Sequence, residues 1–253
     1  LKPFITYPFD RLQQMTYGIR TSELVVIKAP EGIGKTEIFR AFEYHVLKNT
    51  DENIGIIHLE EGKSRMIKGL IGYELNQPIH LPDRQIPKEE IKQGYRKLVG
   101  RDDRVHYYTH FGSDDPDGIL STIRFLAAVC GCKYIFLDHI TMVVTGLAGE
   151  DERKALDYIS TRLAMMVEEL DFSLFLISHV NDQGQTRGSR NITKVADLVI
   201  DLYRDKMAEN EAERNTTYVT VEKNRFAGRT GSAGCLVFDP ETYKISERLE
   251  MPE

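Results

Sequence analysis

Short apolar runs alternate along the chain with longer stretches in which apolar residues recur every three or four positions. The short runs predict buried strands, and the longer stretches predict helices with one apolar face. Their alternation favours an α/β fold, a mostly parallel sheet flanked by crossover helices. The predicted strands are 24–29, 54–59, 105–108, 134–138, 173–178, 198–202, 218–222 and 235–238, and the predicted helices are 35–47, 63–75, 88–98, 118–129 and 150–169.

The sequence contains no internal repeat or low-complexity tract. We therefore expect a single domain over residues 1–253, with 1–20 as its N-terminal lead-in segment. Two stretches, 145–150 and 181–190, predict flexible loops, and the second is rich in Gly, Gln, Asn and Ser. The charged stretch 206–215 predicts a solvated surface segment rather than a binding tail.

Composition narrows the class of protein. Apolar residues make up 41% of the chain and charged residues 28%, as in ordinary globular proteins, and no apolar run approaches the roughly 18 residues of a membrane helix. The cysteines Cys130, Cys132 and Cys235 suit neither a disulfide framework nor a metal site, which indicates a reducing compartment. A net charge of −6 argues against a broad nucleic-acid-binding surface but permits a local basic loop. Because the chain begins with Leu1 rather than Met, we expect it to be a piece of a longer protein.

The segment after the first long apolar run combines glycines with a Gly-Lys-Thr triplet. A strand, such a loop and then a helix is the layout of a P-loop, whose backbone N–H groups converge on phosphate oxygens. Lys35 is then expected to reach the β/γ-phosphates and Thr36 to offer its hydroxyl to Mg²⁺. Ala29 stands where the pattern usually has Gly, and an ordinary strand-to-helix turn is the alternative. The predicted nucleotide-binding residues are Ala29, Pro30, Glu31, Gly32, Ile33, Gly34, Lys35, Thr36 and Glu37.

Polar side chains follow three further predicted strands, and the carboxyl ends of parallel strands form one edge of a sheet. Asp138 is the candidate acid of the Mg²⁺ shell, with a helix cap as the alternative. Glu60 is the candidate general base, provided that its strand lies next to the P-loop strand. Glu61 is the fallback base, and capping of the next helix is the alternative for both. His179 is a candidate γ-phosphate sensor, and its alternative is a structural histidine.

Several motifs occur together along the chain. They are Gly34-Lys35-Thr36, Leu59-Glu60-Glu61, Leu137-Asp138-His139, Ser178-His179, the segments 149–154 and 196–204, Arg187-Gly188-Ser189, and the segment 223–231. As a set, and in their order along the chain, they resemble the ring-forming replicative helicases over about residues 17–245. The closest resemblance is to the bacteriophage primase-helicases, followed by the mitochondrial Twinkle helicase and bacterial DnaB. The resemblance implies a RecA-like P-loop NTPase core with a C-terminal antiparallel hairpin.

The resemblance also implies roles for single residues. Lys35 and Thr36 bind phosphates and Mg²⁺, Asp138 is the second metal-shell acid, Glu60 activates water and His179 senses phosphate. Arg225 matches the family's arginine finger, which enters the ATP site of the neighbouring subunit, and Lys223 lies beside it. Arg204 and Phe238 match positions that sandwich the nucleotide base, and sheet core is the alternative for Phe238.

The resemblance further implies a hexameric ring around single-stranded DNA at a replication fork, with primase and DNA polymerase as further partners and no membrane. The implied DNA-binding residues are Arg187, Gly188, Ser189, Arg190 and Lys194. The loop 181–186 lacks the lysines of the phage enzymes, so the salt dependence of DNA binding should be shallow. We expect the cytoplasm of a bacterial or phage-infected cell, with the mitochondrial matrix as the alternative. Two other functions stay open: a RecA-like recombinase or regulatory ATPase without unwinding, and a nucleotide-switched loader or scaffold.

Overall fold

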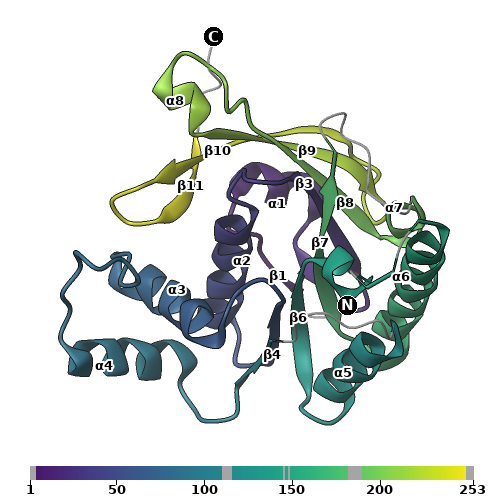
Figure 1. Cartoon of the computed structure of the whole chain (residues 1–253), viewed down its shortest axis with the longest axis horizontal. Helices are drawn as coiled ribbons and strands as arrows, with labels where there is room; N and C mark the ends of the chain where they lie inside the picture. Colours follow the sequence, from purple (N-terminus) through teal and green to yellow (C-terminus); the bar gives the residue numbers. More distant parts are fainter. Residues whose placement is uncertain (1–3, 110–115, 145, 148, 182–189, 249–253) are drawn as a thin grey trace.

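The computed structural model describes residues 4–109, 116–144, 146–147, 149–181 and 190–248. Within these residues, nine strands form one sheet, and a short two-stranded sheet lies near the N-terminus (Figure 1). The strands are β1 (Phe4–Ile5), β2 (Ile19–Arg20), β3 (Leu24–Pro30), β4 (Asn53–His58), β5 (Val105–Tyr108), β6 (Cys132–Asp138), β7 (Ser173–Val180), β8 (Leu198–Tyr203), β9 (Thr216–Asn224), β10 (Gly231–Asp239) and β11 (Lys244–Arg248). The helices are α1 (Asp10–Thr16), α2 (Lys35–Asn49), α3 (Lys63–Leu75), α4 (Lys88–Val99), α5 (Pro116–Ala128), the 3₁₀ helix η1 (Ile140–Val144), α6 (Glu150–Leu170), α7 (Asn191–Val195) and α8 (Glu211–Arg214).

The large sheet has the order β11-β10-β9-β8-β3-β7-β6-β4-β5. The six strands from β8 to β5 pair in parallel, and β9, β10 and β11 join them in antiparallel fashion. The predicted α/β, RecA-like architecture is therefore confirmed. The predicted C-terminal hairpin is also present as β9 and β10, and β11 extends it.

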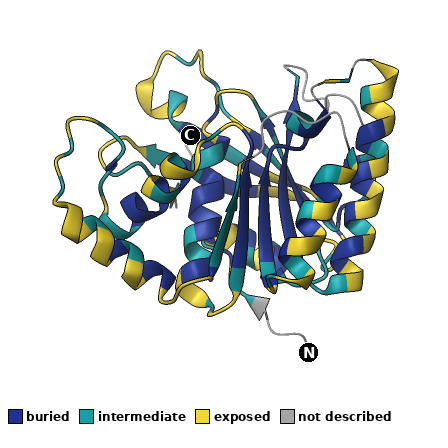
Figure 2. Ribbon diagram, turned by 60° about the horizontal axis from the view of Figure 1, so that its bottom comes forward, coloured by how far each residue is buried: buried dark blue, intermediate teal, exposed yellow. Residues whose placement is uncertain are grey.

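Both faces of the central strands are buried (Figure 2). Along β3, Val25 and Ile27 belong to one apolar cluster, whereas Leu24 and Val26 belong to the other. Helices α1, α2 and α3 contribute to the first cluster, and α5, α6 and α7 contribute to the second. This double burial explains why the central strands read as continuous apolar runs rather than as alternating patterns.

Several short elements were not predicted, namely β1, α1, β2, η1, α7, α8 and β11. Helix α1 shows the physical reason. The backbone N–H groups of Asp10 and Arg11 donate to the Glu247 carboxylate at 2.6 and 3.0 Å, so this helix is capped from the far end of the chain. A cap from a residue so distant in the sequence cannot be predicted from local sequence patterns. Of the predicted loop 181–190, residues 182–189 lie outside the described residues, as do Thr145 and Ala148 of the other loop.

None of the helices within the described ranges combines the length and the apolar character needed to cross a membrane.

Candidate active site

The predicted P-loop connects the end of β3 to the start of α2. Gly32 and Gly34 adopt φ angles of 74° and 80°, in the left-handed region that glycine tolerates best. Gly34 is the N-cap of α2 and supplies no side-chain cap to the N–H groups at the start of the helix. The helix dipole favours an anion at this position. The predicted strand, loop and helix are thus all present.

Lys35, Thr36 and Asp138 converge at the carboxyl edge of the sheet. Lys35 Nζ donates to Asp138 Oδ1 at 2.9 Å, and Thr36 Oγ1 donates to Asp138 Oδ2 at 3.1 Å. Burial alone would raise the pKa of the Asp138 carboxyl, but the charges of Lys35 and His58 hold it below its usual value. The carboxylate therefore stays ionised in a site that is largely closed to water.

Glu60 faces the same site, although the condition placed on it from the sequence was wrong. Strand β4 does not lie beside the P-loop strand β3, because β7 and β6 separate them. Glu60 nevertheless lies 3.6 Å from Lys35 Nζ and 3.1 Å from His139 Nε2. Burial raises the pKa of Glu60, but the His139 hydrogen bond and the positive charge of Lys35 lower it below its ordinary value.

Glu61 points into a different environment. Its two oxygens accept from Arg40 Nη1 and Nη2 at 2.8 and 2.7 Å, and the Arg40 side chain is buried. Burial alone would raise the pKa of Glu61, but the Arg40 hydrogen bonds and His58, whose Nδ1 atom lies 3.6 Å away, hold it far below its usual range. The Glu61 carboxylate therefore binds Arg40 of α2 and does not face the P-loop. Of the two acids, Glu60 is the one that faces the P-loop.

His179 ends β7 beside the P-loop, with its Nδ1 atom 3.5 Å from the Glu31 carboxylate. Its ring stacks on that of His139, with centroids 3.7 Å apart. Its buried Nε2 atom has no hydrogen-bond partner within the described part of the chain. Burial and the neighbouring His139 and Lys35 lower the pKa of His179 to about 4, so the ring is neutral near neutral pH. A neutral ring with an unused nitrogen suits contact with an incoming polar ligand.

Two cations from the β8–β9 connection approach the P-loop. A Cβ atom placed on Gly34 would lie 3.9 Å from Arg204 Nη1, and one placed on Gly32 would lie 3.4 Å from Lys206 Nζ. Lys206 Nζ also donates to the Glu31 carbonyl at 2.9 Å. The stretch 206–215 is largely exposed, as predicted, but Lys206 was missed as a P-loop contact. The only signal for it was a second cation two positions after Arg204.

Phe238 is half-buried on β10 and packs edge-on against Tyr243, with ring centroids 5.0 Å apart. It belongs to neither of the two apolar clusters. Its contact with a nucleotide base stays a prediction.

Arg225 and Lys223 lie at the opposite end of the sheet. Arg225 pairs with Asp197 at 2.7 Å, and the carbonyls of Thr193 and Lys194 accept from Lys223 Nζ at 3.3 and 2.6 Å. Asp197 accepts from the backbone N–H of Leu24, where β3 begins. Since β3 has seven residues at about 3.3 Å each, roughly 20 Å separates this end from the P-loop. Burial and the nearby Arg225 lower the pKa of Lys223.

Of the predicted DNA-binding residues, Arg187, Gly188 and Ser189 lie outside the described residues. Arg190 and Lys194 are exposed at the start and in the last turn of α7. Their contact with DNA stays a prediction.

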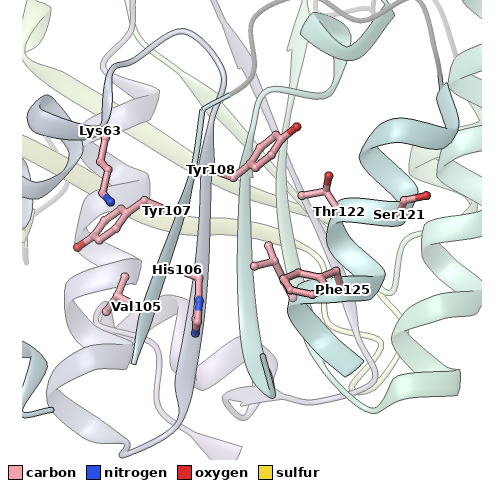
Figure 3. A pocket seen from close by; sticks show the side chains of 9 residues that line it. Lys63, Val105, His106, Tyr107, Tyr108, Ser121, Thr122 and Phe125 are labelled. Carbon is pink, nitrogen blue, oxygen red and sulfur yellow. The ribbon is translucent and has the colours of Figure 1, made fainter. Parts of the chain in front are cut away.

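A groove of about 550 Å³ lies away from the P-loop, along the edge strand β5 and helix α5 (Figure 3). Its lining includes Tyr107, Tyr108 and Phe125, and Lys63 Nζ lies 5.6 Å from the centroid of the Tyr107 ring. None of the predicted site residues lines it.

Comparison with known proteins agrees with this geometry. The family described as "DnaB-like helicase C terminal domain" matches residues 5–247. The chain is 28% identical over 251 residues to the "DNA helicase/primase" of Enterobacteria phage T3, covering 91% of this chain and 43% of that protein. It is 24% identical over 235 residues to the "Replicative DNA helicase DnaC" of Bacillus subtilis (strain 168), covering 86% of this chain and 51% of that protein.

Among solved structures, a chain described as an ATPase domain superposes with a TM-score of 0.78 at 23% identity, covering 96% of this chain and 91% of that one. This likeness supports the fold. The chain spans about half the length of the curated relatives it matches.

Proposed function

The chain belongs to the DnaB-like helicase C-terminal domain family, and from this premise we propose that it is the motor domain of a replicative DNA helicase. It hydrolyses ATP, or another nucleoside triphosphate, to move along single-stranded DNA and to separate the strands of a duplex. Residues 1–253 act as one domain in this proposal, since a single nine-stranded sheet links both halves of the chain. The observation that carries the proposal is the convergence of Lys35 and Thr36 on the Asp138 carboxylate, at 2.9 and 3.1 Å.

The residues at the P-loop fit a triphosphate with Mg²⁺. Gly32 and Gly34, with positive φ, put no side chains of their own on the loop, and Lys35 adds an ammonium group. Thr36 and Asp138 supply a hydroxyl and one carboxylate, and Mg²⁺ in such sites takes few protein ligands and keeps phosphate and water oxygens. When bound, Mg²⁺ neutralises charge that develops on the transferring phosphoryl group.

The side chains around this position take separate roles. Lys35 exchanges its contacts with Asp138 and Glu60 for phosphate oxygens, which frees both carboxylates. Glu60 then orients the attacking water and accepts its proton on a carboxylate oxygen. His179 donates a hydrogen bond to the γ-phosphate. Arg204 and Phe238 hold the base between a guanidinium and a ring, a contact that suits any base.

Arg225 completes the site of a neighbouring subunit. It lies too far from the P-loop of its own chain to act there, and its exposed side chain can leave Asp197. A guanidinium placed against the γ-phosphate is worth about 10³–10⁵ in rate. Lys223 lies beside it and links the same end of β9 to α7 through its hydrogen bonds to the Thr193 and Lys194 carbonyls. This arrangement requires an oligomer, for which we propose a hexameric ring.

Single-stranded DNA passes through the ring in this proposal, against Arg187, Gly188, Ser189, Arg190 and Lys194. The small number of cations predicts a shallow dependence of the binding constant on salt concentration. The T3 relative is named a helicase/primase, so we propose primase as a partner and DNA polymerase as a further one. The cytoplasm of a bacterial or phage-infected cell is the compartment that we propose, and the phage and bacterial sources of the relatives support it.

Unwinding of a forked duplex tests this function. The full-length protein with ATP and Mg²⁺ should separate the strands, and a Lys35→Ala variant of it should not. Hydrolysis without strand separation would support a recombinase or regulatory ATPase instead. Negligible hydrolysis by an assembled ring on DNA would support a loader or scaffold.

A further inference from the structure

His139 follows Asp138 in the chain and contacts three polar side chains of the site. Its Nε2 atom lies 3.1 Å from Glu60 Oε1, its Nδ1 atom is hydrogen-bonded to the Thr141 hydroxyl, and its ring stacks on His179. The side chain is 6% exposed. The roles proposed so far do not use this residue.

The hydrogen bonds of His139 have a defined direction. An ionised Glu60 carboxylate can only accept, so Nε2 carries the hydrogen and donates it. Burial lowers the pKa of His139 despite the Glu60 hydrogen bond, in agreement with a neutral ring. In a neutral ring Nδ1 is an acceptor, and Thr141 Oγ1 therefore donates to it. The Thr141 hydrogen bond thus stabilises the tautomer of His139 that carries its hydrogen on Nε2. This is the tautomer that can donate to Glu60.

The stack joins this chain of hydrogen bonds to the neighbouring strand. Strands β6 and β7 pair in parallel, so His139 and His179 emerge at the same edge of the sheet. Their ring planes are 26° apart, with centroids 3.7 Å from each other. His179 also approaches Glu31 of the P-loop and carries the unpartnered Nε2 atom. His139 accordingly contacts both Glu60 and His179, the proposed phosphate sensor.

We propose that His139 is a positioning residue that couples His179 to the orientation of the Glu60 carboxylate. This inference rests on the proposed function, which assigns water activation to Glu60 and phosphate sensing to His179. When His179 moves, the His139 ring that stacks on it changes orientation. Because His139 Nε2–H donates to Glu60, the orientation of the Glu60 carboxylate changes with it. Thr141 restricts the response by fixing the other side of the ring.

Two substitutions separate the two contacts of His139. His139→Phe keeps an aromatic ring on His179 and loses the hydrogen-bond donor, whereas His139→Gln keeps an N–H donor and loses the ring. In the full-length protein, His139→Phe should lower kcat for ATP hydrolysis by roughly 10–100-fold, both with and without single-stranded DNA, because Glu60 is no longer aligned. His139→Gln should keep the rate without DNA within about threefold. It should lose most of the stimulation by DNA, because it breaks the contact with His179, which leads along the chain to the proposed DNA-binding residues Arg190 and Lys194. KM for ATP should change by less than about threefold in both variants, because neither contact binds the nucleotide.

Thr141 supplies a matched pair that leaves the ring in place. Thr141→Ser should behave as the wild type, and Thr141→Val should lower kcat by several-fold at constant KM, since the ring loses the donor that fixes its tautomer. This pair also keeps the inference testable if a substitution at His139 unfolds the protein, which thermal unfolding would reveal.

Glu60→Gln separates failure of this inference from failure of the proposed function. If Glu60→Gln is inactive while His139→Phe and Thr141→Val keep the wild-type kcat, the positioning role is wrong and the proposed function stands. Wild-type stimulation by DNA in His139→Gln would likewise contradict the coupling. If Glu60→Gln itself hydrolyses ATP at the wild-type rate, the assignment of the base is wrong, and the coupling is overturned with it.

Discussion

The two ends of the sheet hold their charged side chains in opposite ways. At the phosphate end, Lys35 and Asp138 are buried and pair with each other, and Glu60 reaches the same lysine. At the far end, Arg225 has 54% of its side chain exposed and pairs with Asp197. One end therefore presents a fixed set of groups, and the other presents a cation that can change partners.

This difference explains how one active site can be divided between two subunits. Buried polar groups keep their geometry because each must be satisfied by the others. A surface ion pair such as that of Arg225 contributes only about 0–1 kcal/mol, so exchanging Asp197 for a phosphate on a neighbour costs little. The rigid end can receive the ligand, and the exposed end can complete the site of the next subunit.

The largest expected effect comes from the exposed end. Arg225→Ala should leave ATP binding intact and lower the DNA-stimulated rate of hydrolysis by about 10³–10⁵, because transition-state charge loses its guanidinium. Steady-state rates together with binding of a fluorescent ATP analogue measure the two quantities. Arg229→Ala is the matched control from the same turn, where Arg229 donates to the Gln14 carbonyl, and it should change the rate by less than about threefold. If the Arg225→Ala variant still hydrolyses ATP at the DNA-stimulated rate, Arg225 does not take part in hydrolysis.

A comparison of two adjacent acids tests the rigid end. Glu60→Gln should lower kcat by about 10²–10⁴ with little change in stability, because it removes the general base from a half-exposed position. Glu61→Gln should instead lower the free energy of unfolding by about 3–5 kcal/mol, because it leaves buried Arg40 without its bidentate partner. Kinetics and denaturant unfolding of both variants give the answer. If Glu61→Gln lowers kcat and Glu60→Gln lowers stability instead, Glu61 is the base.

The pH dependence of stability probes the packing beneath Glu60. His58 is buried between Glu43 and Glu61, and although burial lowers its pKa, these carboxylates raise it to about 9 from the ordinary value of 6.5. The folded state binds this proton more tightly than the unfolded state. The stabilisation is therefore complete below pH 6.5 and disappears as the pH rises through about 9, a loss of at most roughly 3 kcal/mol.

Thermal unfolding between pH 6 and pH 10 measures this loss, and His58→Gln should flatten the profile in that interval. The same slope in His58→Gln and in the wild type would assign the titration to another group.

The smallest expected effect concerns Lys206. Lys206→Met removes one hydrogen bond to the P-loop carbonyl of Glu31 and should raise KM for ATP by a few-fold, about 1 kcal/mol, with kcat unchanged. Lys92→Met, at an exposed lysine of α4, is the control and should leave KM unchanged. If the two variants have equal KM values, the contact between Lys206 and the P-loop does not contribute to nucleotide binding.

The sequence predicted the elements that local patterns define. The strands with both faces buried were found because their apolar runs are continuous, and the P-loop was found because its glycines and Lys35 are adjacent in the chain. The strand order was not predictable in this way, so the place of Glu60 next to Lys35 was reached through a wrong assumption about neighbouring strands.

The choice between Glu60 and Glu61 also needed the structure. Both follow the same strand, and only the packing of Arg40 from α2 distinguishes them. Lys206 and His139 were not assigned roles for a related reason. Lys206 is 175 positions from Glu31 in the sequence, and His139 contacts Glu60, which follows β4, and His179, which lies on β7. Contacts between residues so distant in the chain leave no local pattern.

Mixing two inactive variants tests most directly whether the active site is shared between subunits. Lys35→Ala subunits lack a working P-loop but keep Arg225, and Arg225→Ala subunits have the reverse defect. If Arg225 acts on a neighbour, an equal mixture of the full-length variants on single-stranded DNA should regain hydrolysis, with about one site in four complete in a randomly assembled ring. A mixture that is no more active than the two variants measured separately would contradict the division of the site between the two ends of the sheet.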